Sequence, residues 1–211
     1  MWPQWSGVVL LVGGGPSLLG FDFERLVHPR WTVVGVNQAL FDAPVHAGFS
    51  IDHGFIERRQ EALREFANTR ALYLCPPPTW ADKIAGWVPN AFHYGSNDRG
   101  FTFDQGKLHR FGGTSGYAAL NMAAQSGAKR IVLLGYDYGG KDGRQHYHDA
   151  YVNERRDGNL HDWGGWVVRY SDAVAAALAV RGIEVINASP SSAIKVFKKM
   201  TIDEALTWAA T

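Results

Sequence analysis

The chain has 211 residues, 46% of them hydrophobic and 13% aromatic, which is enough to bury a full core in one domain. Its 21 basic and 20 acidic residues leave a formal net charge of +1. This balance excludes a global electrostatic attraction to nucleic acid or to anionic membranes. The single cysteine, Cys75, excludes an internal disulfide.

The first residues, Met1 to Trp5, lack the basic start and the long apolar run of a secretory signal. No apolar run approaches the roughly 20 residues that a helix needs to span a bilayer. We therefore expect a cytoplasmic protein without a membrane span.

Short apolar runs rich in β-branched residues recur along the chain and predict strands that are buried on both faces. In chain order, these runs are Val8 to Val12, Thr32 to Val36, the weaker His46 to Ile51, Arg70 to Leu74, Arg130 to Leu134 and Glu184 to Ile186. Helical spacing of apolar residues predicts three helices between and after them, Phe55 to Ala67, Ser115 to Ser126 and Trp166 to Val180.

The alternation of strands and helices predicts an α/β fold that is Rossmann-like, with a mostly parallel sheet and helices on both faces. We expect a single domain over residues 1–211, with irregular loops at 76–113 and 139–165. Ligands of such sheets bind beyond the carboxyl ends of the strands. The expected positions of a binding site are therefore the segments that follow Val12, Val36, Ile51 and Leu134.

The first strand runs directly into a glycine-rich loop. Its glycines allow backbone N–H groups to approach a ligand closely, the proline suits the first position of a helix, and the serine adds a hydroxyl. Free N–H groups at the start of a helix favour phosphate, and Gly20 indicates that any helix here is short. The loop predicts a phosphate site, with a plain strand-to-helix turn as the alternative; its residues are Gly13, Gly14, Gly15, Pro16 and Ser17.

This loop does not match the two commonest nucleotide-binding motifs. Leu18 occupies the position of the last glycine of the dinucleotide fingerprint, and the second strand ends in Asn37 and Gln38 instead of an acidic residue. A nicotinamide cofactor is therefore disfavoured, and the absence of Gly-Lys-Ser/Thr disfavours a P-loop. The amides of Asn37 and Gln38 can read a base edge or a ribose, although Asn37 can also serve as a turn residue.

A second motif precedes the strand Arg130 to Leu134. The sequence reads RFGGTSGYAALNMAAQSGAKRIVLLGYDYGG, in which Thr114 or Ser115 can cap a helix whose first turn also holds Gly116. Such a helix start presents N–H groups and a hydroxyl to a ligand. The segment therefore predicts a second contact with the same ligand.

The two motifs together resemble those of the bacterial family 42 sialyltransferases. They are also similar to a related family that includes archaeal 6-hydroxymethyl-7,8-dihydropterin pyrophosphokinases and many phage and bacterial proteins. The resemblance is carried by Gly-Gly-Pro-Ser-Leu after the first strand, by Thr-Ser-Gly before an alanine-rich helix, and by Tyr-Asp-Tyr after the strand Arg130 to Leu134. It extends roughly from Val8 to Phe197 and is looser between Gln60 and Gly112.

The resemblance implies a nucleotide site. The donor would be held by Gly13 to Ser17 and Thr114 to Gly116, with Asn37 on the nucleotide. The segment INASPSSAIKVF is similar to the family's serine-proline segment and adds Asn187, Ser189 and Pro190. Gln38 extends the predicted nucleotide site on its own residue chemistry.

For a sialyltransferase-like reaction, the resemblance implies a nucleotide-activated sugar as donor. Tyrosines after the aspartate-bearing strand would contact the donor phosphate, and Tyr138 or Tyr147 can supply the phenol. A histidine further along would be the general base, for which His161 is the nearest to the family position and His148 is the other candidate. The acceptor would be a small molecule, a glycan or a modified base, and a homo-oligomer stays open.

A pyrophosphokinase acting on a hydroxymethyl pterin or a similar heterocycle is the alternative. It would need ATP and Mg²⁺, for which Asp137, Asp52 and Asp149 are the available carboxylates. His146 and His148 fall on one side of an extended segment, and with Asp149 and Asp137 they favour a metal site or a phosphate-handling site. We otherwise predict no metal and no firm cofactor. A non-catalytic nucleotide-binding module is the third hypothesis.

Overall fold

The computed structural model of the chain describes residues 2–97, 100–105, 107–109, 114–139, 144–150 and 163–211. Its main sheet is built from eight short strands, which are β1 (Gly7–Val12), β2 (Trp31–Val36), β3 (Ala47–Ser50), β4 (Ala71–Leu74), β5 (Phe92–His93), β8 (Ala128–Leu134), β9 (Glu184–Asn187) and β10 (Lys198–Lys199). Neighbouring strands are parallel throughout, in the order β10-β9-β8-β1-β2-β3-β4-β5. The predicted α/β, Rossmann-like fold with a parallel sheet is confirmed.

Helices and a second small sheet complete the described part of the chain. The helices are α1 (Ala39–Asp42), α2 (His53–Arg58), α3 (Gln60–Thr69), α4 (Ala81–Trp87), α5 (Ser115–Gln125), α6 (Gly164–Val167), α7 (Asp172–Val180) and α8 (Ile202–Ala210). Strands β6 (Gly95–Asn97) and β7 (Lys107–His109) pair in parallel beside the main sheet. No helix within the described ranges is both long and apolar enough to cross a bilayer.

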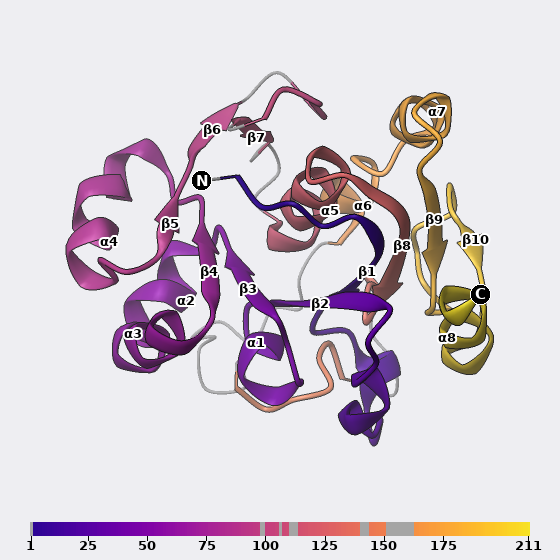
Figure 1. Cartoon of the computed structure of the whole chain (residues 1–211), viewed down its shortest axis with the longest axis horizontal. Helices are drawn as coiled ribbons and strands as arrows, with labels where there is room; N and C mark the ends of the chain where they lie inside the picture. Colours follow the sequence, from indigo (N-terminus) through magenta and orange to yellow (C-terminus); the bar gives the residue numbers. More distant parts are fainter. Residues whose placement is uncertain (1, 98–99, 106, 110–113, 140–143, 151–162) are drawn as a thin grey trace.

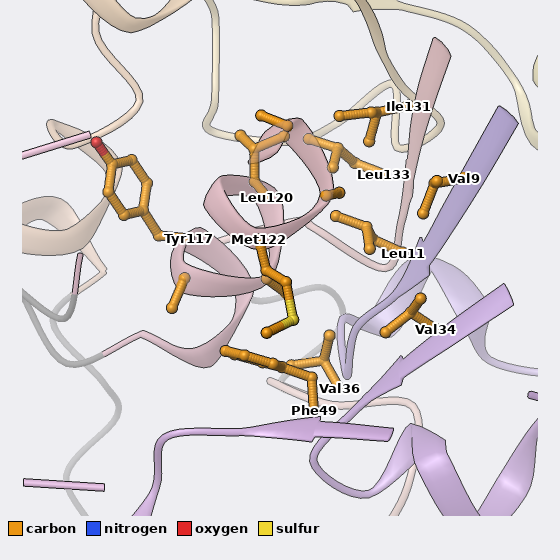
Figure 2. Packing of buried hydrophobic residues seen from close by; sticks show 14 of the residues in the cluster. Val9, Leu11, Val34, Val36, Phe49, Tyr117, Leu120, Met122, Ile131 and Leu133 are labelled. Atoms are coloured by element: carbon orange, nitrogen blue, oxygen red, sulfur yellow. The ribbon is translucent and has the colours of Figure 1, made fainter. Parts of the chain in front are cut away.

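Helices cover both faces of the main sheet (Figure 1). Successive residues of a strand point to opposite faces, so Val9 and Leu11 of β1 pack on the side of α5, while Leu10 and Val12 pack on the side of α1, α3 and α8. Figure 2 shows the first of these cores, where Leu120 and Met122 of α5 face the side chains of β1, β2, β3 and β8. Both faces of the central strands are therefore buried, which explains their continuous apolar sequences.

The side of the sheet to which the chain adds strands changes at β1. From β1 the chain builds outward through β2, β3 and β4, and it later returns to the other side of β1 with β8 and β9. Such a switch point leaves a crevice beyond the carboxyl ends of the two central strands. The loops that follow Val12 and Leu134 lie on either side of this crevice.

All six predicted strands are present, including the weaker third one. Two of the predicted helices are interrupted. The predicted helix Phe55 to Ala67 is two helices, because the backbone of Arg59 leaves the helical region at φ −116° and ψ 20°. The predicted helix Trp166 to Val180 is α6 and α7, because Ser171 adopts an extended conformation and caps α7 through the N–H of Val174.

The segment 76–113 was expected to be an irregular loop, and this expectation is wrong in part, since it contains α4, β5, β6 and β7. Helix α8 and strand β10 were also not predicted from the sequence. A capping box formed by Thr201 and Glu204 marks the start of α8, and this pattern is readable in the sequence. In the segment 139–165, the described residues form no regular element before α6.

Candidate functional site

A cavity of about 350 Å³ opens at the carboxyl edge of the main sheet, where the crevice between β1 and β8 was expected. Segments distant in sequence line it together. Its walls are formed by Gly13, Gly14, Gly15, Val36, Asn37, Gln38, Asp52, Arg58, Thr114, Ser115, Gly116, Gly135, Tyr136, Tyr138, Gln145, His146, His148, Trp163 and Trp166. This volume lies in the range of small-molecule sites.

The glycine loop reaches the cavity with fewer free amides than its sequence indicates. The N–H of Gly13 donates to the carbonyl of Leu134 at 2.8 Å, and the N–H of Gly15 donates to that of Gly135 at 2.8 Å. Among the described residues, Gly14 is the one glycine of the three whose N–H has no protein acceptor. The expected short helix is a single 3-10 turn, Pro16–Leu18. Phosphate binding at this loop stays a prediction, and it concerns mainly the Gly14 amide.

Asp137 lies beneath the glycine loop. A Cβ on Gly15 would come within 1.9 Å of Asp137 Oδ2, so a side chain there collides with the carboxylate. The Ser17 hydroxyl donates to Asp137 Oδ2 at 2.7 Å and lies 2.9 Å from the Ser189 hydroxyl. Burial raises the pKa of the Asp137 carboxyl, although the serine hydrogen bonds act in the opposite direction. Asp137, Ser17 and Ser189 therefore form a support under the loop.

These three residues and Pro16 do not line the cavity. Their predicted contact with a nucleotide or with a reacting group stays a prediction. The roles that the structure gives them are packing and hydrogen bonding under the loop that carries Gly14.

Asn37 and Gln38 both line the cavity, as predicted. Asn37 adopts a left-handed backbone with φ 54°, and its Oδ1 accepts a hydrogen bond from the Ser50 hydroxyl at 2.8 Å. Asparagine tolerates this backbone better than most residues do, so the turn function that the sequence left open is present. Gln38 Nε2 donates to Asp42 at 3.0 Å, while Gln38 Oε1 is buried without a hydrogen-bond partner in the part of the chain described. Gln38 thus keeps an acceptor for a ligand.

The start of α5 forms the opposite wall. Thr114 caps the helix by accepting from the N–H of Tyr117 at 3.1 Å, and its hydroxyl also accepts from Tyr138 at 3.1 Å. The Tyr138 hydroxyl lies 2.8 Å from that of Tyr170. Ser115 Oγ accepts from the N–H of Ile51 at 3.2 Å. The first turn of α5 is therefore tied to the ends of both β3 and β8.

The tyrosines at this wall are protonated at neutral pH. Burial raises the pKa of Tyr138 and raises that of Tyr170 well above its ordinary value. Tyr138 holds a left-handed backbone, with φ 48°, which is rare for an aromatic residue and which its hydrogen bonds and ring contacts stabilise. A Cβ on Gly116 would lie 2.8 Å from the Tyr138 hydroxyl, so this glycine leaves space for the phenol.

Of the predicted catalytic residues, His148 lines the cavity and Tyr147 does not. The Tyr147 hydroxyl donates to Asp42 Oδ2 at 2.7 Å, and its ring packs on Phe23 with centroids 5.4 Å apart. Burial lowers the pKa of His148, against smaller effects of Asp42 and Asp149 that raise it. The other predicted base, His161, lies outside the described residues, as do Gly112 and Gly113.

The carboxylates of the predicted magnesium site are not brought together. Asp137 is buried beneath the glycine loop, Asp52 caps α2 through the N–H of Phe55, and Asp149 is exposed and pairs with Arg144. Across the ranges described, no three histidine, cysteine or acidic side chains gather where they could hold a metal ion. Asp52 lines the cavity, but the other two do not.

Several cavity residues were not found from the sequence. The exposed Arg58, at the end of α2, brings a positive charge, and Trp163 and Trp166 bring aromatic surface. Arg58 fell within the predicted helix Phe55 to Ala67, and nothing in the sequence distinguished it from the other charged residues of that helix. Trp163 lies near the end of the segment 139–165, and Trp166 was the first residue of the predicted helix Trp166 to Val180, so neither was assigned to the site.

The fold and this cavity define an α/β chain of Rossmann type with a cavity at the switch point of its sheet. Its fold is similar to that of two sialyltransferases from Campylobacter jejuni. CstII, solved with the substrate analogue cytidine-5'-monophosphate, matches with a TM-score of 0.56 and 17% identity, covering 94% of this chain and 86% of that one. The monofunctional α-2,3-sialyltransferase Cst-I matches with a TM-score of 0.62 and 14% identity, covering 94% and 81%.

A third structure, CST-II with a trisaccharide acceptor and CMP, has a TM-score of 0.56 and 16% identity over 90% of this chain and 84% of that one. No protein-family model matches the chain, and no curated protein sequence matches it. The shared fold agrees with the resemblance to sialyltransferases. The link to pterin pyrophosphokinases stays a prediction.

Proposed function

We propose that this protein is a glycosyltransferase that uses a nucleotide-activated sugar as its donor. The observation that carries the proposal is that one cavity joins the glycine loop, the pair Asn37 and Gln38, and the start of α5. The resemblance to sialyltransferases assigns the glycine loop, Asn37 and the start of α5 to the nucleotide, and the amide chemistry of Gln38 adds that residue. The fold is that of enzymes solved with CMP and with a trisaccharide acceptor, which supports a nucleotide donor and a glycan acceptor.

In the proposed reaction, an acceptor hydroxyl oxygen forms a bond to the anomeric carbon of the sugar. The bond from that carbon to the donor phosphate oxygen breaks, and its electron pair stays on the phosphate. The hydroxyl proton passes to a histidine of the segment 139–165, where His161 and His148 are the predicted bases. The phosphate gains negative charge as it leaves, so hydrogen-bond donors placed around it stabilise the transition state.

A thermal-shift panel tests the proposal. The melting temperature is measured with CMP, UDP, GDP and ATP, with and without Mg²⁺, because a ligand that binds the native state alone raises it. Release of free nucleotide from the matching sugar nucleotides is then measured with and without EDTA. We expect a rise with at least one of these nucleotides and EDTA-resistant release from its sugar derivative.

Three outcomes would contradict the proposal. Reaction with ATP that EDTA abolishes and that Asp137→Ala stops would favour the pyrophosphokinase. Nucleotide binding without turnover of any sugar nucleotide would favour the non-catalytic module. Absence of any nucleotide-induced shift would remove the nucleotide site itself.

A further inference from the structure

The segment 144–150 lies directly against the glycine loop. The N–H of Tyr147 donates to the carbonyl of Gly14 at 3.0 Å, and the Tyr147 hydroxyl is fixed on Asp42. Tyr147 is held on Asp42 and does not line the cavity, whereas its two neighbours in the chain turn toward the cavity. Both histidines line the cavity, and their rings stack with centroids 5.2 Å apart and an interplanar angle of 13°.

The two imidazoles converge on Gly14. A Cβ built on Gly14 would lie 3.1 Å from His146 Nδ1 and 3.3 Å from His148 Nε2, so a nitrogen of each ring faces this residue. Gly14 also carries the loop amide that has no acceptor in the described ranges. Three hydrogen-bonding nitrogens therefore lie around one peptide at the carboxyl end of β1.

The hydrogen bonding of His148 decides what its cavity-facing nitrogen can do. Its Nδ1 accepts from the N–H of Ala150 at 3.3 Å, so the proton of the neutral ring is on Nε2. Burial and Arg59 lower the pKa of this imidazole while Asp42 and Asp149 raise it, and burial is the largest of these effects. Nε2 is consequently a donor, whereas a general base or a metal ligand needs a lone pair at that atom.

We propose that His146 and His148, together with the Gly14 N–H, form the site that binds the phosphate group of the donor nucleotide. This inference rests on the proposed function and names the residues that hold the leaving group. Two ring nitrogens and a backbone N–H that lie together on a partly enclosed surface suit a phosphate oxygen, and hydrogen bonds to a charged oxygen are the stronger kind. The general base of the transfer is then His161, and His148 is assigned to the leaving phosphate.

The test separates the phosphate from the rest of the nucleotide. Dissociation constants are measured by titration calorimetry for cytidine and CMP, or for the nucleoside and monophosphate that the thermal-shift panel selects. His146→Ala and His148→Ala should each weaken monophosphate binding by about 10- to 100-fold and leave nucleoside binding unchanged, since each removes one hydrogen bond to a charged group. His93→Gln, an exposed histidine on β5, is the matched control and should change neither constant.

A second variant leaves both imidazoles in place. Gly14→Ala adds a methyl group 3.1 to 3.3 Å from the two ring nitrogens, and we expect it to weaken the monophosphate selectively as well. Far-ultraviolet circular dichroism and the melting temperature confirm that each variant is folded. His148→Ala with unchanged CMP affinity and a large fall in turnover would instead assign that histidine as the base.

Some outcomes contradict the phosphate site and leave the proposed function standing, and others contradict the proposed function and leave the phosphate site standing. Equal losses for nucleoside and monophosphate would give the histidines a structural role, and unchanged constants would give them none. In another outcome, the wild type binds the monophosphate and both histidine variants fail to bind it, while the wild type transfers no sugar. This result would support the phosphate site and contradict the glycosyltransferase proposal. Wild-type protein that binds neither compound overturns both.

Discussion

Neighbouring glycines in the loop after β1 serve different purposes. Gly15 is required by packing, since its Cα lies over the buried carboxylate of Asp137 and any Cβ would also come within 2.6 Å of the Gly135 carbonyl. Gly14 faces the cavity and the two histidines, where a Cβ would lie 3.1 and 3.3 Å from the ring nitrogens, so that only the ends of two side chains would have to shift slightly. Identical residues in one motif thus support the fold at one position and the site at the next.

Gly15→Ala should therefore destabilise the whole protein. The added methyl group has to displace Asp137 or the carbonyl of Gly135, and overpacking of this kind costs about 1–3 kcal/mol or more. The free energy of unfolding, obtained from urea denaturation, measures the loss. Gly14→Ala is the matched control, and equal stability of the two variants would contradict this account of the loop.

The buried carboxyl of Asp137 should make stability depend on pH. Burial raises its pKa above the ordinary value of 3.8, so the native state holds this proton at pH values where the unfolded chain has released it. Stability from this group is therefore highest at low pH and falls as pH rises from 3.8 through the native pKa.

Asp137→Asn removes this titration while keeping the shape of the side chain. We expect the variant to unfold at a higher free energy than the wild type at pH 7, with the difference shrinking as the pH falls toward 3.8. Urea denaturation at a series of pH values measures the difference. A difference that does not change with pH would show that the native carboxyl titrates as it does in the unfolded chain.

At the scale of elements, the start of α5 links the helix to the carboxyl edge of the sheet. The Thr114 hydroxyl both caps the helix and accepts from Tyr138, whose own hydroxyl reaches Tyr170. Ser115 reaches the backbone of Ile51, just beyond β3. One helix terminus therefore holds the wall of the cavity in place through side chains that a helix cap alone would not need.

Thr114→Ala should lose the cap and leave Tyr138 without this acceptor. An N-cap replacement by alanine costs about 0.5–2 kcal/mol, and the lost hydrogen bond from Tyr138, whose hydroxyl keeps Tyr170 as a partner, adds about 0.5–1.5 kcal/mol. The melting temperature and the free energy of unfolding measure the combined loss. Thr114→Ser keeps the hydroxyl, so it should stay close to the wild type; a serine variant as unstable as the alanine variant would mean that the methyl group matters instead.

At the scale of the whole molecule, the two hydrophobic cores share their strands. Each central strand sends alternate residues to the α5 side and to the side of α1, α3 and α8. Leu10 and Leu11, adjacent in β1, belong to different cores. Neither core can lose its packing without disturbing the backbone that supports the other.

The chain should consequently unfold as one cooperative unit. We expect the far-ultraviolet circular dichroism and the tryptophan fluorescence to follow the same urea transition, as they do in a two-state protein. The eight tryptophans report on many positions along the chain. Two separate transitions would contradict a single domain over residues 1–211.

The strands and their order of appearance could be read from the sequence. Runs such as Val8 to Val12 are buried on both faces, so their sequences are continuously apolar and can be recognised as strands. Helix ends were less accurate, because the interruptions at Arg59 and Ser171 leave the apolar spacing almost unchanged. The strand β5 has only two residues and gives no periodic signal.

The sequence by itself also determined much of the cavity wall. Gly13 to Gly15, Asn37, Gln38 and Thr114 to Gly116 follow strands or open a helix, and parallel strands bring such segments to one edge of the sheet. Tertiary structure alone decided which atoms of these segments face the cavity, because a hydrogen bond or a packing contact occupies some of them first. It placed Asp137 beneath the loop and Tyr147 on Asp42, and it turned His146 and His148 toward Gly14. Such orientations depend on partners more than a hundred residues away, and local spacing carries no information about them.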